Sequence, residues 1–159
     1  MLGGVGKLTG TRIKLNTDEQ VRPLAQPLIR TPYQTQRQGN VEAEIEHLLD
    51  LDIIDPVKNP TTWVNPIVVV HKANRNDIRI CVDKRRTNED ILRERHLIST
   101  IDEVLQNMQG SKMFSKPDLI MGYHQLELDP ESRIITTFST HLVLYRYKLL
   151  LFGVKSAAE

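Results

Sequence analysis

Helical spacing of apolar residues first appears over residues 40–54. Apolar side chains recur there at intervals of three or four, which predicts an amphipathic helix. Asn40 is placed to cap its first turn, and Pro56 follows its end. A second helix is predicted from Thr100, because Thr100-Ile101-Asp102-Glu103 is a capping-box sequence and Gly110 follows the apolar stripe. We expect that stripe to pack against a sheet; its members are Ile101, Val104, Leu105 and Met108.

Strand-like spacing dominates several other stretches. Residues 66–71 (PIVVVH) are an almost unbroken β-branched run, which predicts a strand buried on both faces. Residues 78–82 (IRICV) predict the return strand of a β-hairpin. Cys81 lies inside that strand, which favours a buried thiol, and as the single cysteine it excludes an internal disulfide. Residues 134–138 and 142–152 are two further β-rich runs.

The stretch FSKPDLIMGYHQLELD, residues 114–129, places a carboxylate before an alternating pattern. After Gly122, the side chains of His124, Leu126 and Leu128 fall on one side, which predicts a strand with one buried face. Asp118 would then lie near the end of that strand, beside a glycine that permits close approach by a ligand. On spacing alone, a metal-binding carboxylate and a solvated turn aspartate both remain open.

The first part of the chain has little periodicity. Residues 1–38 are rich in glycine at the start and carry prolines later, which favours extended chain. Only residues 12–15 (RIKL) alternate like a short strand. No apolar run reaches membrane-spanning length and no signal-peptide pattern opens the chain. We therefore expect an intracellular protein, in the cytoplasm or the nucleus, with no membrane partner.

Charge adds one local feature to this picture. A chain of 159 residues predicts about one domain. The net charge of +1 gives no overall basic field that would indicate nucleic acid. The densest basic cluster comprises Lys84, Arg85, Arg86, Arg93, Arg95 and His96. Two interpretations stay open, a nucleic-acid contact and a solvated face in which acidic residues are interspersed.

Four stretches in order resemble one family. They are PTTWVNPIVVVHK (60–72), IRICVDKRRTNEDILRERHLISTIDEVL (78–105), FSKPDLIMGYHQ (114–125) and ITTFSTHLVLYRYKLLLFGVKSAAE (135–159). They resemble reverse transcriptases of gypsy-type LTR retrotransposons, and the likeness runs from about Lys14 to Glu159. It implies an α+β fingers and palm fragment of a Pol polyprotein, with antiparallel β-hairpins, two or three packed helices and an incomplete palm sheet. Residues 1–38 would be a lead-in, 39–112 fingers-like and 113–159 a partial palm.

The resemblance also implies chemistry. Reverse transcriptases transfer a nucleotide onto a primer 3′-hydroxyl with two metal ions, Mg²⁺ or Mn²⁺. Asp118 matches the family's first catalytic, metal-binding aspartate, and Leu119 would offer its backbone carbonyl to the metal. The sequence lacks the family's Tyr-x-Asp-Asp motif, which supplies the other two carboxylates. We therefore expect this chain alone to hold the metal poorly and to have no polymerase activity.

Further residues match the family's binding surfaces. Lys72 and Arg79 match the hairpin residues that grip the nucleotide triphosphate. Tyr123 matches the aromatic that excludes a ribose 2′-hydroxyl, with a packed strand aromatic as the open alternative. The pocket floor near the sugar is matched by Phe152 and Gly153, with Gln125 in support. The template-contacting segment is matched by Arg85, together with Lys84 and Arg86.

Some positions depart from the family pattern. Ala73 stands where the family has a second hairpin lysine, and Pro117 stands where it usually has leucine, just before the catalytic aspartate. These departures fit relaxed selection. The expected partners are an RNA or DNA template–primer and a dNTP, with self-association through the exposed edge of the incomplete sheet. The alternatives are a non-catalytic nucleic-acid- or protein-binding remnant, and a decayed product without function.

Overall fold

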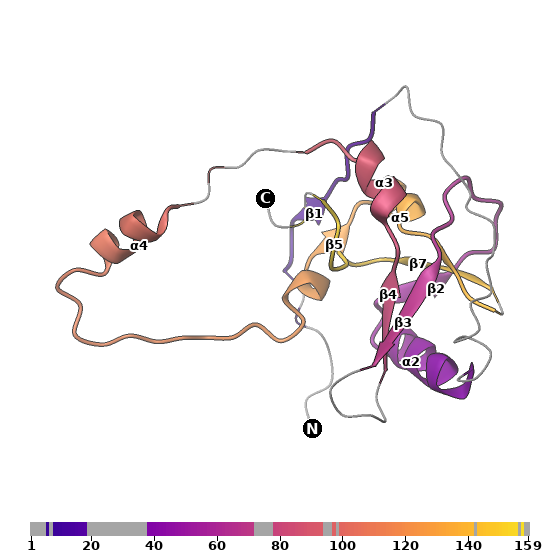
Figure 1. The fold of residues 1–159 in the computed structure, drawn as a ribbon, viewed down its shortest axis with the longest axis horizontal. Coiled ribbons are helices and arrows are strands. Elements are labelled where there is room, and N and C mark those ends of the chain that lie inside the picture. The colour runs from indigo at the N-terminus through magenta and orange to yellow at the C-terminus, as the bar shows by residue number, and fades with distance from the viewer. Residues whose placement is uncertain are drawn as a thin grey trace.

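The structure is a computed structural model that describes residues 6, 8–18, 38–71, 78–93, 97, 99–141, 143–155 and 157. Figure 1 shows the fold and labels its elements. The helices are α2 (Gln38–Asp50), α3 (Arg85–Asp90), α4 (Ile101–Asn107) and α5 (Pro130–Ile135), with a 3-10 turn, η1, at Gly122–Gln125. The strands are β1 (Arg12–Ile13), β2 (Ile54–Pro56), β3 (Ile67–His71), β4 (Ile78–Val82), β5 (Glu127–Leu128), β6 (Phe138–Ser139) and β7 (Leu144–Tyr147).

The strands form three small sheets, and most of the pairing is antiparallel. In the largest sheet β7 lies between β2 and β6, with Tyr147 opposite Ile54 and Tyr145 opposite Phe138. Strands β3 and β4 form the predicted hairpin, whose connecting loop lies outside the described residues. Strand β1 pairs in parallel with β5, so the short strand predicted at residues 12–15 is confirmed at Arg12–Ile13. The predicted α+β class is confirmed.

Helix α2 is the predicted amphipathic helix, but it begins at Gln38, so Asn40 lies inside it and is not its cap. It ends four residues before the predicted limit at Ile54. Asp52 adopts φ 58°, the left-handed conformation that ends many helices. The N–H of Asp52 donates to the Leu49 carbonyl at 2.9 Å, and that of Ile53 donates to Leu48 at 3.0 Å. This pair of bonds is a Schellman motif, which satisfies the last carbonyls of the helix. It turns Ile53 and Ile54 into the core, where they are 0% and 2% exposed.

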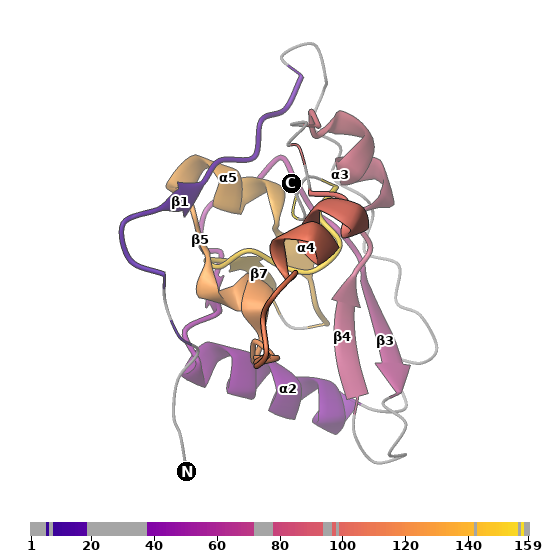
Figure 2. The same cartoon turned by 90° about the vertical axis from the view of Figure 1, so that its left-hand side faces the viewer.

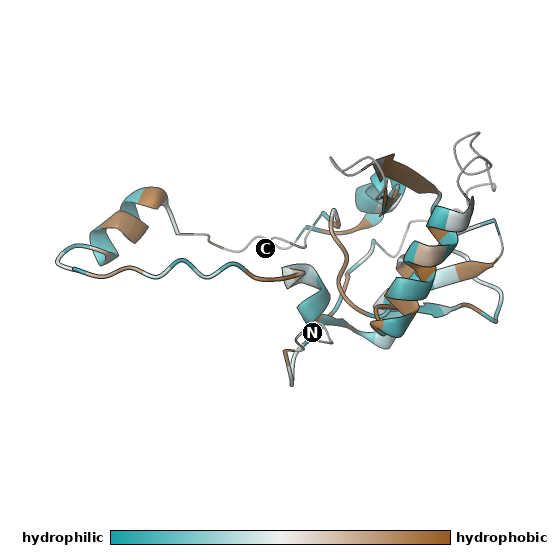
Figure 3. Ribbon diagram, turned by 90° about the horizontal axis from the view of Figure 1, so that it is seen from below, coloured by the Kyte–Doolittle hydropathy of each residue, from teal (hydrophilic) through white to brown (hydrophobic). Residues whose placement is uncertain are grey.

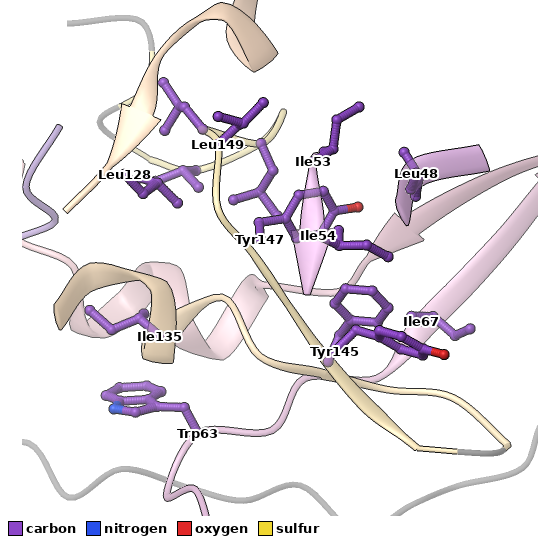
Figure 4. Close-up of a cluster of buried hydrophobic side chains, with 14 of the residues drawn as sticks. Leu48, Ile53, Ile54, Trp63, Ile67, Leu128, Ile135, Tyr145, Tyr147 and Leu149 are labelled. Atoms are coloured by element: carbon purple, nitrogen blue, oxygen red, sulfur yellow. The ribbon is translucent and has the colours of Figure 1, made fainter. Parts of the chain in front are cut away.

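The hydrophobic core lies between α2, the β2–β7–β6 sheet and the hairpin. Figure 2 shows α2 along the bottom of the fold, with one end beside the lower end of the hairpin, and Figure 4 shows buried side chains of the core. Phe138 is fully buried and lies 5.4 Å from the Tyr147 ring and 6.0 Å from the Tyr145 ring, between centroids. Leu128 and Leu149 close the other side at 0% and 1% exposure. One core thus joins residues near 54, near 67 and near 147 of the sequence.

The hairpin is buried on one face, so the prediction of two buried faces for residues 66–71 was wrong. Ile67 is 2% exposed, but Val68 and Val70 are 48% and 45% exposed. Cys81 is also exposed, contrary to the prediction of a buried thiol. The reason is that among the described elements α2 packs against β4, and no described element covers the opposite face of this two-stranded sheet.

Helix α4 has the predicted start but not the predicted packing. The Thr100 hydroxyl accepts from the Glu103 N–H at 3.3 Å, and the Glu103 carboxylate accepts from the Thr100 N–H at 2.9 Å, which completes the capping box. Gly110 adopts φ 81° just beyond the helix. Every residue from 99 to 121 is nevertheless exposed. Figures 1 and 3 show α4 on a long excursion with its apolar side uncovered, so packing against the sheet was wrongly predicted.

Two predicted strands are largely replaced by helical turns. Residues 122–125 form η1 instead of a strand, after Met121 turns the chain with φ 51°, and only Glu127–Leu128 is extended. Residues 130–135 form α5, because Asp129 accepts the Glu131 N–H at 3.1 Å and Pro130 occupies the first turn. In the run at 142–152 the strand is confined to Leu144–Tyr147, and residue 142 lies outside the described residues. Within the described segments, no helix is long and apolar enough to cross a membrane.

Candidate functional site

A cavity of about 610 Å³ opens between the hairpin, α2, α3 and the turn at residues 152–153. It draws on segments that are distant in sequence, because the core described above brings the hairpin and the end of β7 together. Leu48 of α2, Ile80 of β4 and Tyr147 of β7 contribute apolar wall. Arg79, Lys84 and Arg85 contribute positive charge. The cavity therefore combines apolar surface with cations, a composition suited to a phosphorylated ligand with an aromatic part.

The cavity contains five of the residues singled out from the sequence. They are Arg79, Lys84, Arg85, Phe152 and Gly153. Tyr123 stands behind Phe152, with ring centroids 5.6 Å apart and planes inclined by 72°, an edge-to-face pair. Phe152 is 77% exposed, so its ring offers a free surface to a ligand.

Four other predicted residues lie elsewhere. Gln125 donates through Nε2 to the Ile120 carbonyl at 2.9 Å, which braces the chain before η1. Asp118 and Leu119 are exposed on the excursion between α4 and η1, in a segment without helix or strand. Asp118 is therefore not at a strand end, contrary to prediction, because the strand expected after Gly122 does not form there. Arg86 is exposed on α3, and Lys72 lies outside the described residues.

The floor of the cavity is fixed from α3. Asn88 donates through Nδ2 to the Gly153 carbonyl at 2.9 Å, and its Oδ1 accepts the Lys155 N–H at 3.0 Å. Lys84 donates through Nζ to the Phe152 carbonyl. Gly153 adopts φ 83°, a conformation that side-chain-bearing residues rarely take. Three bonds from Lys84 and Asn88 therefore hold the 152–155 turn in place.

Lys84 is the unusual charge in this cavity. It is only 7% exposed, and burial lowers the pKa of Lys84 to about 8. Burial, together with the Lys84 cation, lowers the pKa of His124 below its usual value. The Nδ1 atom of His124 is buried and has no hydrogen-bond partner within the described structure. At neutral pH this wall carries a buried ammonium beside a neutral imidazole.

Arg85, in contrast, is already paired. Its Nε and Nη2 donate to Asp83 at 3.0 and 2.7 Å. The Arg85 guanidinium lowers the pKa of Asp83, and Asp83 raises the pKa of Arg85. The Arg85 side chain remains 88% exposed, so the pair is screened by solvent and leaves guanidinium donors accessible. Arg85 can thus contact a phosphate without leaving Asp83.

The carboxylate expected to bind metal, that of Asp118, belongs to no described cluster of possible metal ligands. Across the described residues, no group of three or more His, Cys, Asp or Glu side chains is placed to hold a metal ion. Mg²⁺ is bound by oxygen ligands in near-octahedral geometry, and one exposed carboxylate supplies little of that. The residues near Asp118 therefore do not fit a metal site by themselves.

Two residues of this site, Asn88 and His124, are not among those that the sequence pattern predicts. Asn88 lies four residues after Lys84, a spacing that puts two side chains on one side of a helical turn. That spacing was a usable signal, because DKRRTN carries polar residues at both positions. His124 had been assigned to the buried side of a strand, and η1 instead places it on the cavity wall.

No family model matches the chain. Among curated relatives, the retrovirus-related Pol polyprotein from transposon 412 of Drosophila melanogaster is 30% identical over 158 residues, 96% of this chain. The corresponding polyprotein from transposon gypsy of the same fly is 31% identical over 122 residues, 75% of this chain. The chain spans 12% of the length of each of these two relatives.

Solved structures support the same relationship at the level of fold. The crystal structure of a prototype foamy virus protease–reverse transcriptase matches 94% of this chain and 19% of its own, with a TM-score of 0.75 and 21% identity. A foamy viral protease–reverse transcriptase solved with an RNA/DNA hybrid matches 96% of this chain and 20% of its own, with a TM-score of 0.71 and 17% identity. The likeness extends over nearly the whole chain, whose homologues are retrovirus-related Pol polyproteins of transposons and whose fold is that of the matching part of foamy viral protease–reverse transcriptases.

Proposed function

We propose that this chain forms the nucleotide- and template-contacting part of an RNA-directed DNA polymerase. The observation that carries the proposal is the cavity, where Arg79, Lys84, Arg85, Phe152 and Gly153 meet from separate segments. Residues 39–112 would be the fingers-like region and 113–159 the partial palm. Relatives described as Pol polyproteins support this assignment.

Arg79 would contact the phosphates of an incoming dNTP, since it lies on β4 and lines the cavity. A guanidinium offers paired donors that match phosphate oxygens. Lys72, which follows β3 in the sequence and lies outside the described residues, would be its partner, as the resemblance implies. Gly153 would allow the sugar to approach the floor, and Gln125 would support the segment that carries Tyr123.

Tyr123 and Phe152 would form the wall that meets the sugar. Their edge-to-face contact fixes the two rings relative to each other, since such pairs add about 0.5–1.5 kcal/mol to simple burial. A ring held in that way leaves no room to adapt to an added 2′-hydroxyl. The cavity would therefore favour deoxynucleotides.

Arg85 and Arg86 would contact the template strand. Both are exposed and lie in the first turn of α3, beside the cavity. Solvent-exposed arginines bind nucleic-acid phosphates with strong salt dependence, because binding releases counterions. One foamy viral protease–reverse transcriptase has been solved with double-stranded DNA and another with an RNA/DNA hybrid, which supports nucleic acid as the partner.

Mg²⁺ or Mn²⁺ would supply Lewis-acid stabilisation of the transferred phosphoryl group and activation of the primer hydroxyl. Asp118, with the Leu119 carbonyl, would be this chain's contribution to holding the ion. Because one carboxylate positions a metal poorly, the chain by itself should bind nucleic acid and nucleotide without catalysing transfer.

The test is binding of a fluorescent primer–template to the chain across a salt series. We expect the association constant to fall steeply with salt, and Arg79→Ala and Arg85→Ala to weaken binding by about tenfold each. Lys112→Ala is the matched control, since Lys112 is an exposed cation between α4 and η1 that does not line the cavity. Equal losses for all three variants would indicate a general charge effect, and no binding at low salt would overturn the proposal.

A non-catalytic nucleic-acid- or protein-binding remnant is the second candidate. It is favoured by the exposed position of Asp118, outside any described group of three or more possible metal ligands. The two candidates predict different results for a longer chain that continues into a Tyr-x-Asp-Asp sequence. Primer extension by that chain, abolished by Asp118→Asn, would support the polymerase, whereas binding without extension would support the remnant.

A further inference from the structure

Lys84 occupies a position that is costly for a cation. Only 7% of its surface is exposed, although it lies on the wall of the cavity. Its Nζ donates to a single described acceptor, the Phe152 carbonyl, whereas an ammonium has three donors. Burial of a cation without a counter-ion is strongly unfavourable. The folded chain therefore contains a buried charge that its own contacts compensate only in part.

The neighbouring groups do not neutralise it. Among the described residues, no carboxylate forms an ion pair with Lys84. Asp83 is engaged by Arg85 through three contacts of 2.7–3.2 Å. Glu44 also lines the cavity, but it forms no described ion pair with Lys84. His124, on the same wall, keeps its buried Nδ1 without a partner. On this wall Lys84 thus has one described acceptor for its three donors and His124 Nδ1 has none, whereas buried polar groups are ordinarily hydrogen-bonded.

We propose that Lys84 is an anion-recognition residue of the cavity, where its buried ammonium pairs with a phosphate group of the ligand and selects phosphorylated ligands over nucleosides. This inference rests on the proposed nucleotide site and adds a phosphate contact on its floor. It also assigns Lys84 to the cavity instead of the template path that the resemblance implied. Phosphate oxygens would satisfy the remaining Lys84 donors, and a protonated Nδ1 of His124 would add another.

This role makes stability and binding respond in opposite directions. Replacement of Lys84 by methionine keeps a long unbranched side chain and removes the buried charge. If Lys84 serves ligand recognition, Lys84→Met should raise the midpoint of thermal unfolding and weaken anion binding. If Lys84 only holds the 152–155 turn through the Phe152 carbonyl, the same substitution should lower the midpoint.

The experiment is calorimetric titration of the chain with tripolyphosphate, dTTP, thymidine and an oligothymidylate, at pH 7 and fixed salt. Wild type should bind tripolyphosphate and dTTP, and should not bind thymidine measurably. Lys84→Met should lose about tenfold or more in affinity for both, with a raised unfolding midpoint. Lys155→Met is the matched control, because Lys155 is exposed in the same turn and does not line the cavity. Its affinities should stay within about twofold of wild type.

The probes separate the possible outcomes. Dependence on Lys84 for dTTP identifies a nucleotide phosphate, and dependence for oligothymidylate alone identifies a backbone phosphate. In wild type, proton NMR should show the His124 pKa rising on binding, because the anion offsets the Lys84 cation. Unchanged affinity in Lys84→Met, a lowered midpoint, or no tripolyphosphate binding by wild type overturns the inference.

Failure of the inference is distinguishable from failure of the proposed function. If primer–template binding depends on Arg79 but phosphate binding is unchanged in Lys84→Met, the proposed function is supported and the inference about Lys84 is overturned. If tripolyphosphate binding depends on Lys84 but the chain prefers neither dTTP nor primer–template, the anion site is supported and the polymerase assignment is overturned.

Discussion

Asn65 and Thr137 are joined twice through one carbonyl oxygen. The backbone N–H of Asn65 and its side-chain Nδ2 both donate to the Thr137 carbonyl, at 2.9 and 2.8 Å. Nδ2 also reaches the Ile135 carbonyl at 3.1 Å, and Asn65 Oδ1 accepts from the Thr87 hydroxyl at 2.5 Å. Asn65 is 2% exposed and Thr87 is 4% exposed. One buried amide thus ties the start of the hairpin to α3 and to the chain just before β6.

Asn65→Ala should therefore be strongly destabilising. It removes the side-chain bonds and leaves the Thr87 hydroxyl unpaired in the interior, at a cost of about 2–4 kcal/mol in the free energy of unfolding. Urea unfolding followed by circular dichroism measures the loss. Asn107→Ala is the matched control, since Asn107 is exposed at the end of α4 and should change stability by less than about 0.5 kcal/mol. Similar losses in both variants would refute a structural role for the buried network.

The buried Lys84 predicts an unusual pH dependence. Its pKa is about 8 in the folded chain, against 10.5 as the ordinary value. Between these two pH values the unfolded chain binds more protons, so the free energy of unfolding rises with pH, by about 3 kcal/mol over the whole window. Below pH 8 the lysine is charged in both states and the burial cost is fully present. Lys84→Met should be more stable than wild type at pH 7, with an advantage that shrinks by about 3 kcal/mol toward pH 10.5.

The measurement must isolate Lys84 from its neighbours. The titratable or charged groups that share its cavity are Glu44, His47, Arg79, Cys81, Asp83, Arg85, His124 and Tyr147. Burial raises the pKa of Tyr147, so that residue favours the folded state less as the solution becomes alkaline. Chemical unfolding of wild type and Lys84→Met at each pH cancels such shared contributions. A constant difference from pH 7 to pH 10.5 would contradict an uncompensated buried lysine.

Local signals in the sequence predicted the fold well wherever local contacts determine it. The capping box at Thr100 forms, because its two hydrogen bonds need only residues three apart. The hairpin forms because two apolar runs flank a short polar segment. Helix α2 follows its apolar repeat as far as Asp50. Its end escaped prediction because Asp52 in the left-handed conformation is not visible in an apolar pattern.

Tertiary context decided the rest. The alternation after Gly122 is compatible with a strand, but no described strand pairs with residues 122–125, and the chain coils into η1 instead. For the candidate site, the sequence predicted several of the residues that contribute, but not which of them lie close together in the folded chain. Arg79 and Phe152 meet only because the core closes between β4 and β7. The burial of Lys84 and the role of Asn88 depend on the same closure.

Mg²⁺ should not change the thermal stability of this chain. Because Asp118 is exposed and belongs to no described group of three or more possible metal ligands, Mg²⁺ has no preformed site to stabilise. We expect millimolar Mg²⁺ to leave the midpoint of thermal unfolding unaltered, in wild type and in Asp118→Asn alike. Differential scanning fluorimetry with and without Mg²⁺ tests this, with Glu131→Gln as the control for a non-specific carboxylate effect. A Mg²⁺-dependent rise that Asp118→Asn alone abolishes would mean that Asp118 does form a site in this chain.

Helices α2 and α4 should respond oppositely to the same kind of substitution. Ile45 of α2 is 6% exposed and lies in the core, so Ile45→Glu buries an unpaired charge and should unfold the chain. Leu105 of α4 is 56% exposed, and leucine and glutamate have similar helix propensities. Leu105→Glu should therefore change the free energy of unfolding by less than about 0.5 kcal/mol.

Leu105→Glu should still change the surface. Ile101 and Leu105 are 77% and 56% exposed, and they lie four residues apart on one apolar side of α4. Such a surface binds apolar dyes and favours association. The Ile101→Glu, Leu105→Glu double variant should therefore bind less apolar dye, seen as lower dye fluorescence. Its sedimentation coefficient, measured by sedimentation velocity, should fall to that of a monomer. If Leu105→Glu instead destabilises the chain as Ile45→Glu does, α4 packs against the rest of the protein in solution and its apolar side is not a free surface.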